Sequence, residues 1–348
     1  MKTSPEEGER PVRPGSRTGP SHRAGSELSP SAVHQARVEI KTILVPLDFS
    51  PASMEALAYG VSLAKKFQAA VHLVHVHQPD EASSVPGAGH LMRETAEAIA
   101  FLREHLSEVQ RKHVPSFWPE NCHVRGGVVY QEIVDLAGEI NADLIVLGTR
   151  GRTGLKRILL GSTAERVVRF ASRPVLVVRL RKRKGRATAG TATPASAAEL
   201  HIRKILVPVD FSQCSMAGAM YAAFLGKAFG AKLCLLHAVQ PPAPVVVDRV
   251  SVDRSSMDGL NLRNARLDME AFSKLDFLRD ITCAVEIRTG YPVDQICDET
   301  KQTDVDLAVI STHGRSGFNR MLLGSVAEHV VRYAECPVLV VPSRCSTS

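Results

Sequence analysis

The chain has 348 residues with a formal net charge of +7, and 44% of its residues are hydrophobic. This length and composition predict about two globular domains with proper cores. The seven cysteines are an odd number, widely spaced and without a CxxC pair, which excludes a disulfide scaffold or a zinc ribbon and predicts reduced thiols in the cytoplasm.

The distribution of apolar, aromatic and basic residues disfavours membrane and nucleic-acid functions. No uninterrupted apolar stretch reaches the roughly 18–20 residues of a membrane span, and the N-terminus lacks the layout of a secretory signal. Aromatic residues, at 5%, are too few for a platform that stacks single-stranded bases. Six basic residues between Arg179 and Arg186 account for most of the net charge. We therefore expect a solvated linker there, with no membrane and no specific nucleic acid as a partner.

Low-complexity segments bound the expected domains. Residues 1–38 contain five prolines and no aromatic residue, so we expect a disordered tail. A basic segment rich in alanine and threonine over residues 181–200 predicts a flexible linker. Between and after these segments we expect a first domain over residues 39–180 and a second over residues 201–344.

The two expected domains are copies of one another. The segment TILVPLDFS, Thr42 to Ser50, recurs as KILVPVDFS, Lys204 to Ser212. The 18 residues from 161 to 178 recur from 324 to 341 with 13 positions identical. Because each copy is domain-sized, the pattern indicates a tandem duplication rather than a short solenoid repeat.

Strand and helix patterns alternate through both copies. In the first copy, short apolar runs predict strands over Ile43–Leu47, Val71–Val76, Cys122–Val129, Leu144–Leu147 and Val175–Val178. Helices are predicted after an N-cap at Ser50 with Pro51 next, and over about Arg93–Lys112, Ile133–Ile140 and Ser162–Ala171. The second copy repeats the strands at Ile205–Val209, Leu233–His237, Ala284–Ile287, Leu307–Ile310 and Val338–Val341. Five strands that alternate with four helices in each copy predict two doubly wound parallel sheets of the α/β class.

Unusual residues follow the first and fourth expected strands, whose carboxyl ends meet where the strand order of such a sheet reverses. Pro46-Leu47-Asp48 ends the first strand, and Gly148-Thr149-Arg150-Gly151 follows the fourth, nine residues before Gly161-Ser162-Thr163. Glycines let a ligand approach backbone N–H groups, and a helix that begins with these last three residues offers N–H groups and two hydroxyls to a phosphate. We therefore expect an anion site here, although the loop is not a Walker A motif.

Pro-x-Asp after the first strand, with Gly-x2-Gly-x9-Gly-Ser/Thr after the fourth, resembles the universal stress protein family in its tandem form. The resemblance covers both copies, about four-fifths of the chain. It implies two flavodoxin-like, adenine nucleotide α-hydrolase-like sheets of order 3-2-1-4-5, and bound ATP in one branch of the family. For the adenine and ribose, it implies contacts with Pro46, Leu47, Asp48 and Val76. For the ribose and phosphates, it implies contacts with Leu147, Gly148, Arg150, Gly151, Gly161, Ser162 and Thr163.

The second copy departs from this pattern at three positions. Ser311 replaces the first glycine, His313 replaces Arg150, and Ala238 replaces Val76. If the first glycine needs a positive φ, a serine there costs about 1 kcal/mol; its hydroxyl is alternatively a ligand contact. We expect the first site to bind nucleotide better. The implied contacts of the second site are Pro208, Val209, Asp210, Ile310, Ser311, His313, Gly314, Gly324, Ser325 and Val326.

These residues also have structural interpretations. Asp48 and Asp210 suit turns in which a carboxylate bonds the following backbone N–H groups, and Ser162 and Ser325 suit helix N-caps. Their coincidence at one expected switch point, in duplicate, favours nucleotide binding.

Three histidines, His72, His75 and His77, share the second expected strand. Alternation places His72 on the face opposite His75 and His77. Because no carboxylate or cysteine partner is evident from the sequence, we expect no metal site.

The patterns together favour a cytoplasmic, stress-associated protein that binds ATP or another adenine nucleotide for signalling or stress tolerance. No carboxylate lies in the phosphate loops, so we expect Mg²⁺ to be held by phosphate oxygens and water, with at most slow ATP hydrolysis. The apolar last strands need cover, which predicts that the two copies pair as an internal pseudo-dimer. A homodimer of the whole chain stays open.

Two other functions stay open. One is an interaction scaffold without nucleotide, which Ser311 and Ala238 favour. The other is an adenylate-transferring enzyme of a related fold, although Asp48-Phe49-Ser50-Pro51 is not the Ser-Gly-Gly-x-Asp-Ser loop that such an enzyme needs. A receiver-type phosphoacceptor is disfavoured because the third strand ends in Gly126-Gly127-Val128-Val129, without an aspartate.

Overall fold

The structure is a computed structural model that describes residues 38–78, 89–115, 118–149, 160–179, 200–241, 254–314 and 323–342. Every described residue belongs to one compact unit, which begins at Val38. The expected tail, except for residue 38, and the expected linker, except for residue 200, lie outside the described residues. We call residues 38–179 half 1 and residues 200–342 half 2.

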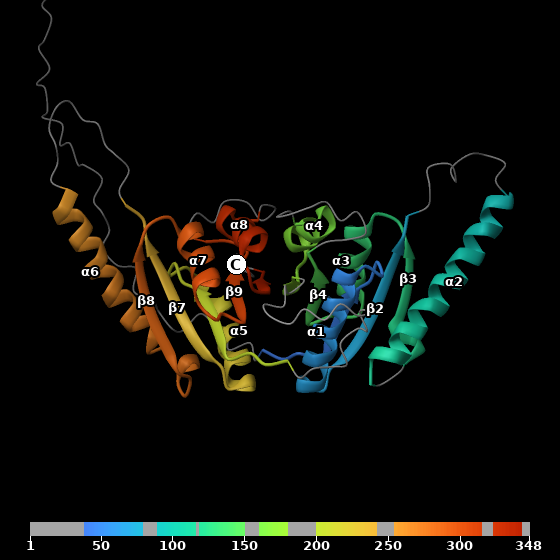
Figure 1. Cartoon of the computed structure of the whole chain (residues 1–348), viewed down its shortest axis with the longest axis horizontal. Helices are drawn as coiled ribbons and strands as arrows, with labels where there is room; N and C mark the ends of the chain where they lie inside the picture. Colours follow the sequence, from blue (N-terminus) through green and yellow to red (C-terminus); the bar gives the residue numbers. More distant parts are fainter. Residues whose placement is uncertain are drawn as a thin grey trace, which may run out of the picture. The chain divides into compact units, whose positions relative to one another are not determined.

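Each half alternates strands and helices in the same order (Figure 1). Half 1 contains β1 (Thr42–Pro46), α1 (Pro51–Phe67), β2 (Ala70–His77), α2 (Gly89–His113), the 3₁₀ turn η3 (Pro119–Asn121), β3 (Cys122–Gly126), α3 (Val129–Glu139), β4 (Leu144–Gly148), α4 (Ser162–Phe170) and β5 (Val175–Val178). Half 2 contains β6 (Lys204–Pro208), α5 (Gln213–Phe229), β7 (Lys232–Val239), α6 (Arg254–Ser273), the 3₁₀ turn η4 (Asp276–Leu278), β8 (Cys283–Thr289), α7 (Pro292–Gln302), β9 (Leu307–Ser311), α8 (Ser325–Tyr333) and β10 (Val338–Val341). None of the helices among the described residues is long and apolar enough to cross a bilayer.

The strands of each half pair in parallel in the order 3-2-1-4-5, which confirms the predicted flavodoxin-like topology. The prediction of two separate sheets is corrected in one respect. Strands β5 and β10 pair antiparallel, with Leu176 opposite Leu339, so the ten strands form one continuous sheet. The two last strands therefore cover one another's apolar edge, as the sequence predicts.

Local sequence explains where α1 begins and why the third strand is shorter than predicted. The hydroxyl of Ser50 accepts a hydrogen bond from the N–H of Ser53, and Pro51 occupies the first turn, where its missing N–H is not needed. The prediction of a strand over Cys122–Val129 is wrong at its end, because β3 stops at Gly126. Gly127 has φ of 143°, a backbone angle that glycine adopts readily and other residues rarely adopt, so the chain turns there. Val129 already begins α3.

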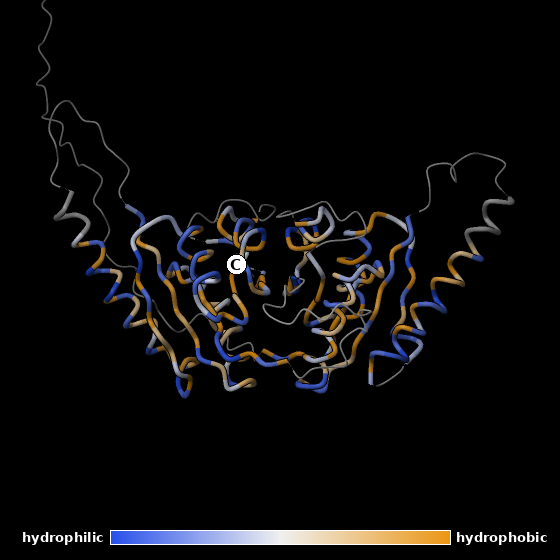
Figure 2. The backbone as a smooth tube through the Cα atoms, viewed as in Figure 1, coloured by the Kyte–Doolittle hydropathy of each residue, from blue (hydrophilic) through white to orange (hydrophobic). Residues whose placement is uncertain are grey.

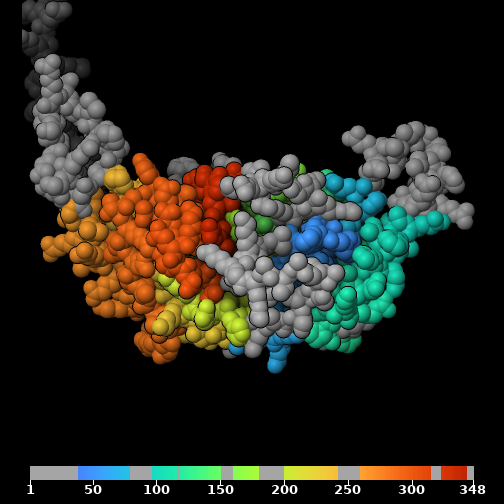
Figure 3. All heavy atoms as spheres, in the orientation of Figure 1, coloured from blue at the N-terminus to red at the C-terminus, as the bar shows by residue number. Residues whose placement is uncertain are grey.

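Two apolar layers cover the faces of the sheet. One contains residues of α1 and α5 packed on alternate strand residues such as Val45 and Val207, and the other contains residues of α3, α4, α7 and α8 packed on Leu44 and Leu206. The inner strands β4 and β5 are buried along nearly their whole length, as expected for a parallel sheet that is covered on both faces. Figure 2 shows hydrophobic and hydrophilic colour mixed along the outer strands. Helix α2, the teal flank of half 1 in Figure 3, packs on the outer strands β2 and β3.

Side chains also join the halves beside the β5–β10 pairing. Phe67 stacks on Phe224 with ring centroids 5.1 Å apart, and Arg332 lies 3.4 Å from Glu165. A cavity of about 20 Å³ lies between the halves, with Tyr59 and Tyr221 among its lining residues. This volume is that of about one water molecule, so the cavity is a packing defect rather than a ligand site.

Candidate functional site

The segment after β1 is held in one conformation by hydrogen bonds to its neighbours. The N–H of Leu47 donates to the carbonyl of Val74 over 2.8 Å, which extends the pairing with β2 by one residue. The Oδ1 atom of Asp48 accepts a hydrogen bond of 3.0 Å from the N–H of Ser50, the N-cap of α1. Asp48 therefore forms the turn that the structural interpretation expects, at the carboxyl end of the central strand of half 1.

The loop after β4 returns to the end of its own strand. The N–H of Gly161 donates to the carbonyl of Thr149 over 2.7 Å, and the N–H of Thr149 donates to Val178 over 3.0 Å. These two bonds hold the start of α4 beside the carboxyl ends of β4 and β5. The predicted elements of the site, Pro46-Leu47-Asp48, Gly148-Thr149 and Gly161-Ser162-Thr163, thus lie at the strand-order reversal.

The N-cap of α4 differs from the structural interpretation offered by the sequence. The capping residue is Gly161, with no side-chain hydrogen bond to the helix, and Ser162 is the first helical residue. The same is true of Gly324 and Ser325 at α8. The expectation that the two serines are N-caps is wrong, and the first-turn N–H groups of both helices have no side-chain cap. Such N–H groups favour an anion.

Gly148 is required by close packing rather than by its backbone angle. Gly148 is not among the described glycines with positive φ, so a serine at this position carries no cost from a positive φ. A Cβ atom on Gly148 would instead lie 2.6 Å from the carbonyl oxygen of Ala52 in the first turn of α1. The glycine therefore allows α1 to approach the end of β4 closely.

Half 2 repeats the same connections. The Oδ1 atom of Asp210 accepts from the N–H of Ser212 over 3.0 Å and from its hydroxyl over 2.6 Å. The N–H of Gly324 donates to Thr312 over 2.8 Å. A Cβ on Gly314 would lie 2.6 Å from Oδ2 of Asp210, so the loop after β9 touches the carboxylate that follows β6. The two motifs therefore meet in half 2.

The substituted residues of half 2 form a local network in its loop. The hydroxyl of Ser311 donates to the carbonyl of His313 over 2.9 Å, so this hydroxyl bonds the loop itself. Nδ1 of His313 lies 3.0 Å from Oγ1 of Thr312. Nε2 of the same ring is buried and has no hydrogen-bond partner among the residues that the structure describes. The loop after β9 is thus held by hydrogen bonds between its own residues, one of which uses the serine hydroxyl that a glycine lacks.

Sequence reasoning missed a histidine and a phenylalanine that support the β1 turn in half 1. Phe49 has φ of 62°, which is rare for an aromatic residue, and its ring stacks on His75 at 4.9 Å. Nδ1 of His75 lies 2.7 Å from the carbonyl oxygen of Leu47. Positive φ in a bulky residue costs about 1 kcal/mol, and these contacts hold it in place.

Half 2 has the same support. Phe211 has φ of 63°, lies 4.5 Å from the ring of His237, and His237 lies 2.7 Å from the carbonyl oxygen of Val209. The signal that could have found these residues is the duplication itself. Phenylalanine recurs in Asp-Phe-Ser, and the two histidines occupy matching positions on β2 and β7.

The remaining predicted residues divide into lining and buried positions. Val76 and Val326 are half-buried against the core. The side chains of Leu47, Leu147, Val209 and Ile310 are buried in the core, so only their backbone is available to a ligand. Pro46 and Pro208 end their strands and are half-buried. Arg150 and Gly151 lie outside the described residues.

Comparison with known proteins agrees with this arrangement. The model of the universal stress protein family matches residues 39–179 and again residues 201–342. The chain belongs to the universal stress protein family. That membership gives it a general role as a stress protein and confirms the tandem form that the sequence motif predicts.

Related universal stress proteins match either one half or the whole chain. A universal stress protein of Mycolicibacterium smegmatis is 27% identical over 314 residues, which cover 87% of this chain and 97% of that protein. Universal stress protein MJ0531 of Methanocaldococcus jannaschii is 39% identical over 148 residues, which cover 41% of this chain and 84% of that protein. The crystal structure of a universal stress protein from Archaeoglobus fulgidus covers 88% of this chain and 97% of its own with a TM-score of 0.57 at 21% identity, which establishes the shared fold.

Proposed function

We propose that the strand-order reversal of half 1 binds ATP or another adenine nucleotide, and that the protein acts in nucleotide-dependent signalling or stress tolerance rather than as an efficient enzyme. The observation that carries the proposal is the hydrogen bond from Gly161 to Thr149. It holds the uncapped first turn of α4 beside the ends of β4 and β5. A ligand in this position meets oriented backbone N–H groups at the positive end of a helix dipole.

The chemistry of the surrounding residues fits a nucleotide. The uncapped N–H groups at the start of α4 suit the phosphates. Asp48 supplies a carboxylate at the end of the central strand, suited to ribose hydroxyls. Mg²⁺ would be held by phosphate oxygens and water, with slow hydrolysis at most.

Half 2 supports a weaker site or none. The Ser311 hydroxyl already bonds the carbonyl of His313, and the fixed positive charge of arginine is replaced by an imidazole. The second candidate function is an interaction scaffold. Half 2 suits it because half 2 keeps the fold while its Ser311 hydroxyl bonds its own loop. The pairing of β5 with β10 joins half 2 to half 1 in one sheet. Cytoplasmic location, a whole-chain homodimer and the protein partner stay predictions.

The test is a calorimetric titration with ATP of the full chain, first freed of any bound nucleotide, using two isosteric variants. Asp48→Asn keeps an oxygen that can accept from Ser50 but removes the charge offered to the ribose. We expect affinity about tenfold weaker than wild type, and Asp210→Asn serves as the matched control with a smaller change. Equal affinities in the wild type and Asp48→Asn would contradict the site assignment. No heat from any of the three proteins would favour the scaffold function.

A further inference from the structure

Two histidine rings meet at the outer edge of the sheet in half 1, away from the strand-order reversal. His72 lies on β2 and His123 on the edge strand β3. Because Leu73 pairs with Cys122 and Val74 with His123, the two histidines are two residues out of register. Nδ1 of His72 lies 3.1 Å from Nε2 of His123, and the rings are nearly parallel, with an interplanar angle of 10°. Both side chains are half-buried. The sequence predicts no metal site here because no carboxylate or cysteine partner is evident, and the structure places another histidine, His123, beside His72.

We propose that His72 and His123 are the protein ligands of a transition-metal site of the zinc and copper class. Two nitrogen ligands of a tetrahedral zinc ion, each at about 2.0–2.1 Å, lie roughly 3.3 Å apart. The observed separation of 3.1 Å therefore suits a shared ion after a rotation of the rings, without movement of the strands. In the metal-bound state each ring carries its hydrogen on the outer nitrogen, so the proton now between the rings moves within one imidazole and none is lost.

The geometry of the pair suits a shared ion. The two half-buried rings lie nearly parallel, and each presents one nitrogen atom to the other. Imidazole nitrogen is a preferred ligand of zinc and copper.

The nearby carboxylate of Glu139 is held by Arg125, from which it accepts a hydrogen bond of 2.9 Å. Water would fill the other coordination positions of a zinc ion held by the two histidines.

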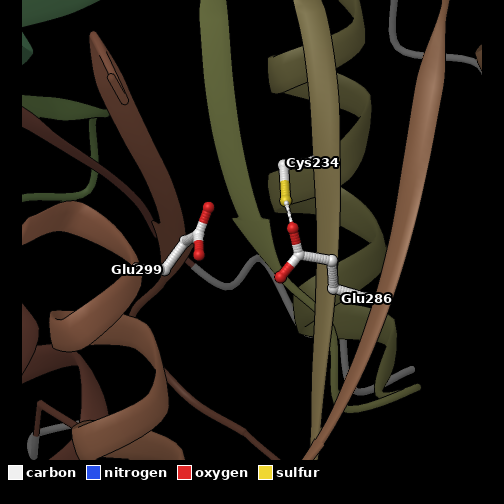
Figure 4. Close-up of side chains that lie close together, drawn as sticks. All are labelled: Cys234, Glu286 and Glu299. Carbon is white, nitrogen blue, oxygen red and sulfur yellow. Dashed lines mark hydrogen bonds between the residues drawn. The ribbon is translucent and has the colours of Figure 1, made fainter. Parts of the chain in front are cut away.

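The matching place in half 2 carries a different cluster, which we infer does not bind a metal. Cys234 replaces His72 and Glu286 replaces His123, with Sγ and Oε1 3.5 Å apart, and Glu299 of α7 faces them (Figure 4). The three ligand atoms lie within 4.8 Å of one another. These three side chains are therefore close enough together to be a candidate metal cluster in half 2.

Charges already present oppose a metal in half 2. Lys204 donates to Glu299 over 2.8 Å, and Arg288 bonds both Glu286 and Glu299. Burial raises the pKa of the Cys234 thiol to about 12, helped by the charge of Glu286. A metal ion here would have to displace two cations and a proton. Half 2 is therefore the internal control for the proposal.

The test is a titration of the full chain, freed of metals by a chelator and without nucleotide, with zinc chloride alone. We expect binding of one equivalent in the micromolar range or tighter, and a rise in melting temperature. His72→Gln and His123→Gln should each weaken binding by about tenfold or more. His201→Gln, which changes an exposed histidine, and Cys234→Ser, which removes the thiol of half 2, should leave binding unchanged.

Two outcomes overturn the proposal: no zinc or copper binding by the wild type, or equal binding by the wild type and both histidine variants. Nitrogen-15 spectra of the histidine rings in the wild type keep the test valid if the variants do not fold. Zinc should shift the signals of two histidines that contact one another and leave His201 in place. Shifts confined to other histidines would show that the pair is a structural hydrogen bond only. Because no nucleotide is present, failure of this test is separate from failure of nucleotide binding.

Discussion

Half 1 and half 2 have the same strand order, the same turns after their first strands and the same hydrogen bond at the start of α4 and α8. They differ in side chains at the strand-order reversal and at the outer edges of the sheet. Half 1 has Gly148 where half 2 has Ser311, and a histidine pair where half 2 has an ion network. The backbone of the strand-order reversal is therefore the same in both halves while the side chains there differ. A shared fold does not establish that both halves bind the same ligand.

The largest expected effect concerns the ion network of half 2. Glu299 is fully buried and accepts from Lys204 and Thr303, each over 2.8 Å. Glu299→Gln leaves two cations facing a neutral amide, so we expect the free energy of unfolding to fall by about 3 kcal/mol. The measurement is urea denaturation.

Half 1 supplies the control for this variant, since Thr42 and Leu136 occupy the positions of Lys204 and Glu299. The double variant Lys204→Thr/Glu299→Leu removes both charges and should lose less stability than Glu299→Gln alone. A double variant that is less stable than the single one would refute the view that the two halves solve the same packing problem differently.

The second effect concerns the close approach of α1 to β4. Gly148→Ala adds one carbon atom that would lie 2.6 Å from a carbonyl oxygen, and we expect a loss of about 2 kcal/mol together with weaker ATP binding. Gly138→Ala, on α3 with nothing within 4 Å of the added carbon, should keep or raise stability. Thermal melting with and without ATP measures both quantities, and equal behaviour of the two variants would contradict the packing argument.

The third effect is a pH dependence that only half 1 should show. The pKa of His72 is lowered, and that of His123 is lowered from 6.5 to about 4. The unfolded chain therefore binds more protons in this window, and stability present above pH 6.5 is lost as the pH falls toward 4. Allowing for solvent exposure, the wild type should lose about 1 kcal/mol more than His72→Gln/His123→Gln. The measurement is the free energy of unfolding of both proteins between pH 7 and pH 4. A constant difference between the two proteins over this range would contradict the prediction.

The smallest effect compares the ends of α1 and α5. Gln68 ends α1 with φ of 57°, whereas Gly230 ends α5 with φ of 67° and nothing within 4 Å of an added Cβ. Gln68→Gly should stabilise the protein by about 0.5–1 kcal/mol, and Gly230→Gln should destabilise it by a similar amount. Differential scanning calorimetry would detect both shifts, and shifts of the same sign would show that other contacts decide these caps.

Much of the fold could be predicted because its signals are local. The last strands Val175–Val178 and Val338–Val341 are predicted to the residue, since apolar β-branched runs follow a proline in each. The predicted third strand is too long because Val128 and Val129 are residues that favour strands. The turn that ends β3 depends on the backbone angle of Gly127, which the sequence does not show. The pairing of β5 with β10 was predicted as a need for cover, but the single ten-stranded sheet was not.

The site could be predicted in its composition but not in its contacts. The residues of the two motifs lie together because both follow strands that end at the strand-order reversal. The role of Gly148 could not be read from sequence, because the carbonyl of Ala52 approaches it from a distant helix. The contact of His72 with His123, 51 residues apart along the chain, depends in the same way on the register of two strands. Non-local contacts of this kind decide the chemistry at each edge of the sheet.

The most direct test of the central claim is to denature freshly purified wild-type protein and identify any released nucleotide by mass spectrometry. The account predicts an adenine nucleotide at about one equivalent per chain, lost in Asp48→Asn and retained in Asp210→Asn. Wild-type protein that releases no nucleotide and whose melting temperature does not respond to millimolar ATP would contradict nucleotide binding at the strand-order reversal of half 1.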